Sequence, residues 1–207
     1  MLQIDHVIFV AADLEVAAAK LLDRHGLASL PGGRHPGHGT ANRIVPLGDS
    51  YLELMGFVDE AEAAASPMGR WALDHRRPDP VPLALCLRTD DIAPIAAALG
   101  ETPLAMDRVR TDGVRLSWKL AGLEGMLGTQ SLPFFIQWEV APEDHPGAAT
   151  APHRIAPKGI AEVVVGPVTG PLARIIAGVP GVRITRGHPG VHWVGIPTER
   201  GRIVLKD

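Results

Sequence analysis

The sequence predicts an α+β protein in which a β-α-β-β-β module is repeated along the chain to form a cupped, mixed β-sheet with outer helices. Two observations predict this fold class. Around Asp13 and again around Asp91, a strand pattern leads into an Asp-initiated helical pattern that ends at a glycine. A loop and two strand patterns follow the first helix, and three strand patterns follow the second. The chain of 207 residues, 46% of them hydrophobic, is also long enough to bury a sizeable core.

The first module is expected over about residues 1–58. Its opening strand pattern is rich in β-branched residues, and the helix that follows begins after Asp13 and is closed by Gly26. Four glycines and two prolines in Pro31–Thr40 predict a loop, which we expect to border a cavity mouth and to move when a ligand binds. The expected elements are strands over 3–10, 42–47 and 51–57 and a helix over 14–25.

Two further modules are expected along the chain. The second covers about residues 81–140, and a third, shorter one covers residues 158–207 after a connector rich in Pro, Gly, Ala and His. Residues 1–141 are expected to form one domain of two paired modules, with the third module packed on it. Pairing buries the open faces of the small sheets and leaves a concave cavity, where small ligands bind. The later strand patterns of the second module cover 104–111, 115–123 and 134–140, and those of the third cover 160–167, 182–187, 191–198 and 202–207.

Charge and composition argue against several kinds of partner. The formal net charge is -3 and the pI is near 6.3, so neither a nucleic-acid-binding nor an anionic-membrane surface is expected. The first residues carry no signal-peptide pattern, and no apolar run approaches the ~18 residues that a membrane span needs. We therefore expect a cytoplasmic protein. Cys86, the single cysteine, lies in an apolar run and is expected to be a buried thiol rather than a nucleophile.

The chain resembles the glyoxalase-like branch of the vicinal oxygen chelate superfamily on three segments, IDHVIFVAADLEVAA, GGRHPGHGTANRIVPLGDSYLELMG and SLPFFIQWE. The resemblance covers roughly the first two-thirds of the chain. It implies a bacterial-type protein with a cup of paired modules and, as in many relatives, a divalent metal bound by side chains on the first and last strands of the modules. Zn, Ni, Mn and Fe are the candidate ions. Relatives commonly dimerise, so a homodimer is expected.

Strand alternation places two polar residues of the first module inside that cavity. His6 lies on an otherwise apolar strand face, and Glu53 shares a face with Tyr51 and Met55. A carboxylate in such a place is costly to bury unless it is paired, hydrogen-bonded or bound to a cation. The resemblance places the two strands side by side, so His6 and Glu53 supply an imidazole and an oxygen donor for a divalent ion. A hydrogen bond that merely satisfies the two buried groups is the alternative.

The second module matches a metal site less well. Ala84 stands where a second histidine is expected, and Gln137 is the polar residue that matches Glu53 in the last strand. The candidate ligands are therefore His6, Glu53 and Gln137, a set that leaves open coordination positions, as a catalytic site requires. The alternative is a site that binds metal poorly or not at all. In the third module, Glu162 takes the place of His6.

Other residues complete the candidate site. His38, in the glycine-rich segment, is a candidate catalytic residue that would donate a proton to a developing oxyanion, and Glu53 is either a ligand or the base. An exposed turn position is expected for His35 more than for His38. The candidate substrate-binding residues are Asn42, Arg88, Trp118 and Gln137.

Three functions from different classes remain open. The first, which the resemblance implies, is a metal-assisted lyase or isomerase acting on a small oxygenated carbonyl compound. The second is a metal-free protein that binds or sequesters a small molecule, and the missing ligand of the second module favours it. The third is an inactive paralogue that serves as an interaction module through its additional third module.

Overall fold

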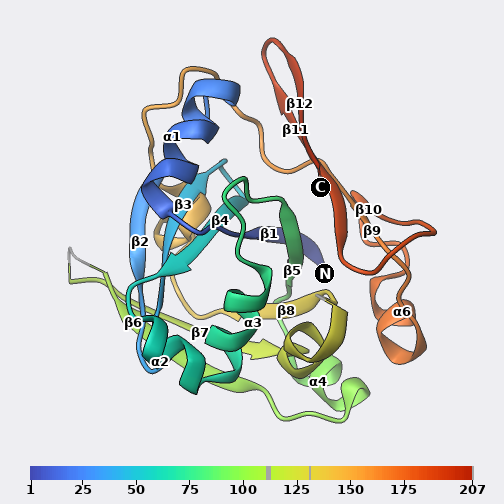
Figure 1. Ribbon diagram of the computed structural model, residues 1–207. Helices are drawn as coiled ribbons and strands as arrows, with labels where there is room; N and C mark the ends of the chain where they lie inside the picture. The colour runs from blue at the N-terminus through green and yellow to red at the C-terminus, as the bar shows by residue number, and fades with distance from the viewer. Residues whose placement is uncertain (111–112, 131, 207) are drawn as a thin grey trace.

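The computed structural model describes residues 1–110, 113–130 and 132–206, and it contains two β-sheets surrounded by helices (Figure 1). The larger sheet consists of β1 (Gln3–Val10), β2 (Leu30–His35), β3 (Thr40–Pro46), β4 (Tyr51–Phe57), β5 (Pro82–Arg88), β6 (Leu104–Val109), β7 (Arg115–Ala121) and β8 (Phe134–Trp138). The smaller sheet consists of β9 (Glu162–Val165), β10 (Val182–Ile184), β11 (Val191–Thr198) and β12 (Gly201–Lys206). The α-helices are α1 (Leu14–His25), α2 (Glu60–Ala65), α3 (Pro67–His75), α4 (Ala93–Leu99), α5 (Leu123–Gly125) and α6 (Gly170–Ile176). A π-helical turn (Met126–Gln130) and two 3-10 turns (Pro142–Asp144 and Pro146–Ala148) complete the elements.

The larger sheet is built from two modules with the same internal strand order, which confirms the predicted fold class. Its order is β2-β3-β4-β1-β5-β8-β7-β6. The first strand of each module pairs in parallel with the last, β1 with β4 and β5 with β8, and the remaining pairs within each module are antiparallel. The modules join where β1 runs antiparallel to β5. The sheet curls so far that side chains of the edge strand β6 reach β2 and β3.

Local signals in the sequence set both ends of α1. The side chain of Asp13 accepts hydrogen bonds from the backbone N–H groups of Glu15 and Val16, which satisfies two donors of the first turn. Gly26 ends the helix with a φ of 71°, a left-handed conformation that glycine adopts without strain. The predicted boundaries of this helix are therefore confirmed.

The prediction of a loop over Pro31–Thr40 is wrong. The strand β2 occupies the first half of this segment, and only residues 36–39 form the turn into β3. As an edge strand β2 bonds to β3 alone, and its pairing shifts register at its two glycines, so a proline and glycines cost it little hydrogen bonding. His35 and His38 border the cavity described below. Movement of the segment on ligand binding stays a prediction.

The smaller sheet covers the convex side of the larger one. β11 contacts β5 and α6 contacts α4, and in Figure 1 the orange-to-red C-terminal segment lies beside β1 and β5. Apolar residues of both sheets, among them Leu85, Val163 and Ile196, belong to one core cluster. None of residues 158–206 borders the cavity on the concave side. The third module therefore covers the sheet from behind and does not join the cup.

This third module has the predicted order of elements but a different order of strands. β9 pairs in parallel with β10 and antiparallel with β11, which gives the order β10-β9-β11-β12. Only residues 177–181 separate α6 from β10, so the crossover returns directly beside β9. Whether residues 158–207 form a separate domain stays a prediction. Two predicted strands end at residues 111 and 207, which lie outside the described residues.

A second apolar cluster fills the concave side of the larger sheet, with members from β1, β4, β5, β7, β8 and α3. The helix α3 and the π-helical turn contact each other over this side. Met68 from α3 and Met126 from the turn border the cavity beneath them. In the described parts of the chain, no helix is both long and apolar enough to span a membrane.

Candidate functional site

A cavity of about 240 Å³ lies between the concave face of the sheet and the helical segments above it. Its polar side chains come from the first module, with Arg108 on β6 as the exception, whereas most of its apolar wall comes from the second. The polar lining consists of His6, His35, His38, Asn42, Tyr51, Glu53 and Arg108. The apolar lining includes Ile8, Met55, Met106, Trp118, Phe134, Ile136 and Trp138.

His6 and Glu53 point into this cavity from neighbouring parallel strands, as strand alternation predicts. β1 and β4 pair with His6 beside Tyr51 and with Ile8 beside Glu53. Both polar side chains are buried, and Nε2 of His6 lies 3.6 Å from Oε2 of Glu53. The ring of Tyr51 stacks on the imidazole of His6 with 4.5 Å between the ring centroids, which restricts the imidazole plane.

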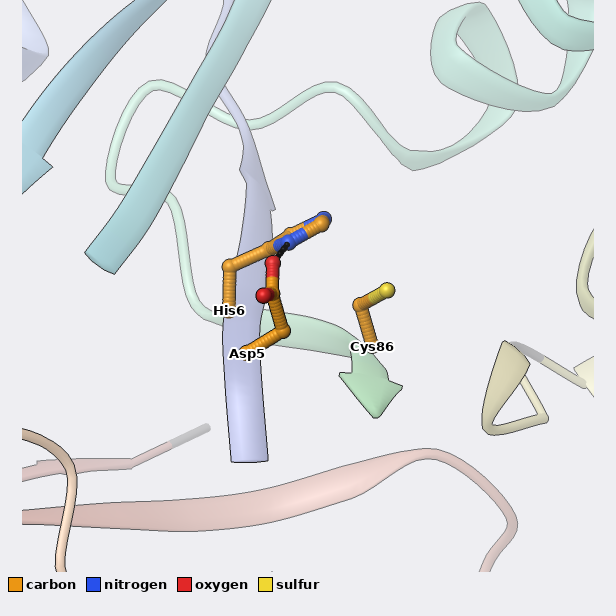
Figure 2. A group of neighbouring side chains, drawn as sticks. All are labelled: Asp5, His6 and Cys86. Atoms are coloured by element: carbon orange, nitrogen blue, oxygen red, sulfur yellow. Dashed lines mark hydrogen bonds and ion pairs between the residues drawn. The ribbon is translucent and has the colours of Figure 1, made fainter. Parts of the chain in front are cut away.

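Asp5, a residue that strand alternation does not place in the cavity, holds the other nitrogen of His6. The pairing of β1 with β5 shifts register between Ile4 and His6, so the strand is irregular at Asp5 and the normal alternation of faces does not hold there. Asp5 is fully buried, and its Oδ1 accepts a hydrogen bond of 2.6 Å from Nδ1 of His6 (Figure 2). The available signal was a carboxylate next to His6 in a strand of mostly apolar residues.

The second oxygen of Asp5 accepts hydrogen bonds from two later segments of the chain. Nε1 of Trp138 donates to it at 3.1 Å, and Nε2 of His145, from the connector, donates at 3.0 Å. Because Nδ1 of His145 accepts from the backbone N–H of Gly147, this ring carries its proton on Nε2. Burial works to raise the pKa of Asp5, but the hydrogen bonds from His145 and His6 outweigh it and hold that pKa well below its usual range.

These contacts fix the tautomer of His6. An ionised Asp5 can only accept, so Nδ1 of His6 carries the proton of the bond between them. The lone pair on Nε2 then faces the carboxylate of Glu53, which is also an acceptor. Two acceptors 3.6 Å apart repel each other unless a proton or a metal cation lies between them. The pair is therefore a place for a positive charge.

Asn42 and His35 surround the other oxygen of Glu53. Nδ2 of Asn42 donates to Oε1 at 2.8 Å, and Nε2 of His35 lies 3.7 Å from the same oxygen. The expectation of an exposed turn position for His35 is wrong, because β2 carries it to the cavity, where its Nδ1 bonds with Oγ1 of Thr40. Burial is the main influence that lowers the pKa of His35, and it favours the neutral ring.

His38 and Trp118 also border the cavity. His38 lies in the turn between β2 and β3, and its Nδ1 is buried with no hydrogen-bond partner in the described part of the chain. A buried polar atom without a partner is costly, so this nitrogen is available to a ligand. Trp118 lies beside Trp138, with 5.4 Å between their ring centroids, and the two indoles form an aromatic wall at the apolar end.

Gln137 and Arg88 do not reach the cavity, which corrects both assignments. Alternate residues of β8 border the cavity, and Gln137 lies between them on the other face, where its Oε1 accepts from the backbone N–H of Ile92 at the start of α4. It serves α4 and is not placed to bind a metal or a substrate. Arg88 ends β5 and bonds with the side chain of Gln3 and the carbonyl of Asp49.

Asp5, His6 and Cys86 form another grouping, with ligand atoms that lie within 4.8 Å of one another (Figure 2). Burial raises the pKa of the Cys86 thiol well above its usual value, which disfavours the thiolate that binds metal. The oxygens of Asp5 already accept three hydrogen bonds. On the cavity side, by contrast, His6 Nε2 and Glu53 Oε2 have free lone pairs at a spacing that suits two donors, each about 2.0–2.2 Å from a metal. A divalent ion fits there better.

The other modules add no ligand to this pair within the described residues. Ala84 on β5 and the cavity-facing residues Phe134 and Ile136 of β8 are apolar. Glu162 lies in the smaller sheet, where it pairs with Arg202. An ion held by His6 and Glu53 would keep most of its coordination positions for water or substrate, as a catalytic ion requires.

Comparisons with known proteins show one matching family and several similar solved structures. A family model described as a glyoxalase-like domain matches residues 4–174, which include both modules, the connector and β9. A hypothetical protein from Staphylococcus aureus aligns with 100% of this chain and 86% of its own at 16% identity, with a TM-score of 0.62. A variant of Streptomyces coelicolor methylmalonyl-CoA epimerase, in complex with 2-nitronate-propionyl-CoA, aligns with 67% of this chain and 96% of its own at 18% identity, with a TM-score of 0.47. No curated protein matches the chain at a significant level.

The family match extends over more than half of the sequence, and the Staphylococcus aureus structure shares the fold along the whole chain. The curled sheet of two matched modules is the arrangement that the resemblance implies. The chain therefore belongs to the glyoxalase-like domain family of the vicinal oxygen chelate superfamily.

Proposed function

We propose that this chain is a metal-assisted lyase or isomerase that acts on a small oxygenated carbonyl compound, with His6 and Glu53 as the ligands of a divalent cation. One observation carries the proposal. His6 Nε2 and Glu53 Oε2 are two acceptors 3.6 Å apart at the polar end of a cavity that is otherwise largely apolar. A bound Zn, Ni, Mn or Fe ion would supply a Lewis acid that polarises the carbonyl oxygen of the substrate.

The groups of the chain itself orient the substrate and move protons. Asp5 holds His6 in the tautomer that presents Nε2 to the cavity, as partners of metal-binding histidines do. As the base, Glu53 would accept a proton from the carbon next to the carbonyl, and Asn42 orients the carboxylate by donating to its Oε1. His38 presents its buried Nδ1 to a developing oxyanion. The apolar wall excludes water from the reacting atoms.

Metal titration tests this proposal. Protein purified without chelator, stripped and titrated with each of the four ions is expected to bind one ion per chain, and His6→Ala and Glu53→Gln are each expected to weaken binding at least about tenfold. Cys86→Ser and Glu162→Gln are the matched controls. They remove a thiol of the alternative grouping and a carboxylate remote from the cavity, so binding remains unchanged. A wild-type protein that binds none of the four ions in stoichiometric amount overturns the metal-assisted function.

A metal-free binding or sequestering protein is the second candidate, and the apolar second-module side of the cavity favours it. Phe134 and Ile136 line the second-module side of the cavity, where a full metal site would have further ligands, and they offer apolar surface to a ligand instead. For such a protein, an apolar ligand binds the chelator-treated chain, and Glu53→Gln leaves its affinity unchanged. A ligand that binds only with the metal present supports the enzyme.

A further inference from the structure

Arg108 brings a positive charge to the cavity from the second module. It lies on the edge strand β6, is partly buried and borders the cavity. Among the described residues, its side chain has one hydrogen bond, a long contact of 3.5 Å from Nη1 to Oδ1 of Asn42. Within the described residues no carboxylate pairs with it, whereas the nearby Arg110 and Arg115 pair with Asp144 and Asp107.

Two glycines of β2 make room for this guanidinium and for Asn42. A Cβ on Gly33 would lie 2.6 Å from Nη1 of Arg108, and a Cβ on Gly32 would lie 2.0 Å from Oδ1 of Asn42. The backbone N–H of Gly33 also donates to Oδ1 of Asn42 at 2.8 Å. Neither glycine has a positive φ, so their contribution is the space that the missing side chains leave.

The surroundings of Arg108 suit an anion. The amide of Asn42 lies between Arg108 and Glu53. Its Oδ1 accepts from Arg108 and its Nδ2 donates to Glu53, so the two charged side chains do not pair directly. The buried Nδ1 of His38 borders the same cavity without a partner of its own among the described residues. A partly buried charge without a counter-charge is unfavourable, and the planar guanidinium matches a carboxylate with two parallel hydrogen bonds.

We propose that Arg108 binds the carboxylate of an anionic substrate whose apolar body lies against Trp118 and Trp138. This inference rests on the proposed function, because it assigns a substrate class to the same cavity. The amide of Asn42 contacts both Arg108 and Glu53, so the carbonyl on which the enzyme acts lies close to the carboxylate of the substrate. The substrate class is an oxo acid with an apolar body.

A matched acid and amide test this subsite separately from the metal. The probes are 4-phenylbutanoate and 4-phenylbutanamide, which share a shape and differ in charge. Both are titrated into the chelator-treated full chain and followed by the NMR signal of the Trp118 indole N–H. Wild-type protein is expected to bind the acid at least about tenfold more tightly than the amide, as charge-assisted hydrogen bonds predict. Arg108→Gln brings the ratio of the two affinities to about one, and Arg108→Lys retains part of it.

Two further variants separate the local contact from the general charge. Gly33→Ala displaces the guanidinium without changing the net charge and is expected to lower the acid-to-amide ratio. Arg115→Gln removes a charge from the neighbouring strand β7 and is expected to leave the ratio unchanged. Because the probes are measured without metal, loss of ion binding in His6→Ala and loss of acid preference in Arg108→Gln report on different proposals.

Three results overturn the subsite. The first is a wild-type protein that does not prefer the acid to the amide. A wild-type protein that binds neither 4-phenylbutanoate nor its shorter and longer homologues counts as the same result. The second is a preference that persists in Arg108→Gln. The third is an equal loss of preference in Arg115→Gln, which would assign it to the overall field of the protein rather than to Arg108.

Discussion

A chain of hydrogen bonds decides which nitrogen of His6 faces the cavity. The backbone N–H of Gly147 fixes the proton of His145 on Nε2, this nitrogen donates to Asp5, and Asp5 accepts the proton of His6 Nδ1. His145 lies in the connector, outside both modules, and does not border the cavity. It reaches the cavity residues through its hydrogen bond to Asp5 and through ring contacts with Tyr51 and Trp138. It is therefore a positioning residue.

His145→Ala is expected to remove one of the three donors to Asp5 and so to weaken the preference of His6 for the Nδ1–H tautomer. The ¹⁵N chemical shifts of the His6 ring in the metal-free protein measure this, and metal affinity is expected to fall about 10- to 100-fold. His145→Gln, whose amide nitrogen can replace Nε2 as donor, restores both. Ring shifts that do not change in His145→Ala would show that His145 serves the fold alone.

The sequence predicts part of this site for a clear physical reason. His6 and Glu53 lie in regular stretches of strand, where alternation fixes the face of each side chain. Alternation does not predict the position of Asp5, because the pairing of β1 with β5 is irregular at that residue. It does not predict the contact of His145 with Asp5 either, because no periodicity links a connector to a strand so distant in sequence. The sequence does not show which face Gln137 shares, because β8 carries large apolar residues on both faces and alternation alone does not identify the one that meets the cavity.

The elements follow the sequence where local signals are strong. The capped helix α1 and the strands β1, β3 and β4 agree with their predicted positions, whereas the sequence predicts a loop where β2 forms. An edge strand tolerates proline and glycine because half of its backbone groups bond to solvent. The short helical segments between β7 and β8 carry no amphipathic repeat long enough to be recognised.

The turn between β2 and β3 offers a matched pair of glycines for a test at this scale. Gly37 and Gly39 both have a positive φ, 78° and 62°, so alanine at either position costs about 1–2 kcal/mol in backbone strain. A Cβ on Gly39 would also lie 2.1 Å from the carbonyl oxygen of Asp59 and 2.3 Å from the backbone nitrogen of Ala63, whereas a Cβ on Gly37 meets nothing within 4 Å. A side chain at Gly39 would therefore overlap the backbone at the start of α2, whereas Gly37 meets α2 through the hydrogen bond from its N–H to Glu62, which alanine would keep.

Gly39→Ala is expected to lower the free energy of unfolding by about 1–3 kcal/mol more than Gly37→Ala, because backbone atoms must move to relieve the overlap. Urea unfolding of the two variants measures the difference. Equal losses would mean that the turn can move away from α2 without cost, and β2 would then be free to act as the mobile segment that the sequence predicts.

The whole molecule depends on contacts between its units. One apolar cluster joins the convex face of the larger sheet to the smaller sheet, so the third module contributes to the core that supports β1 and β5. On the concave side, Asp5 accepts hydrogen bonds from His6 on β1, Trp138 on β8 and His145 in the connector. A homodimer, a cytoplasmic location and a bacterial origin stay predictions.

Asp5 should make the stability of the whole molecule depend on pH. Its pKa in the folded protein lies well below the value of about 3.9 for an unfolded chain, so its ionised form stabilises the fold at neutral pH. This contribution is complete above the unfolded pKa and is lost as the pH falls from about 4 through the folded pKa. In chelator-treated protein at neutral pH, Asp5→Asn is expected to lower the free energy of unfolding by about 3 kcal/mol, because three donors, of which His6 and His145 are buried, lose a charged acceptor. Urea unfolding of wild type and variant should show a constant gap down to about pH 4 and a narrowing gap below it. A gap that stays constant in acid would mean that Asp5 is not held ionised by His6 and His145.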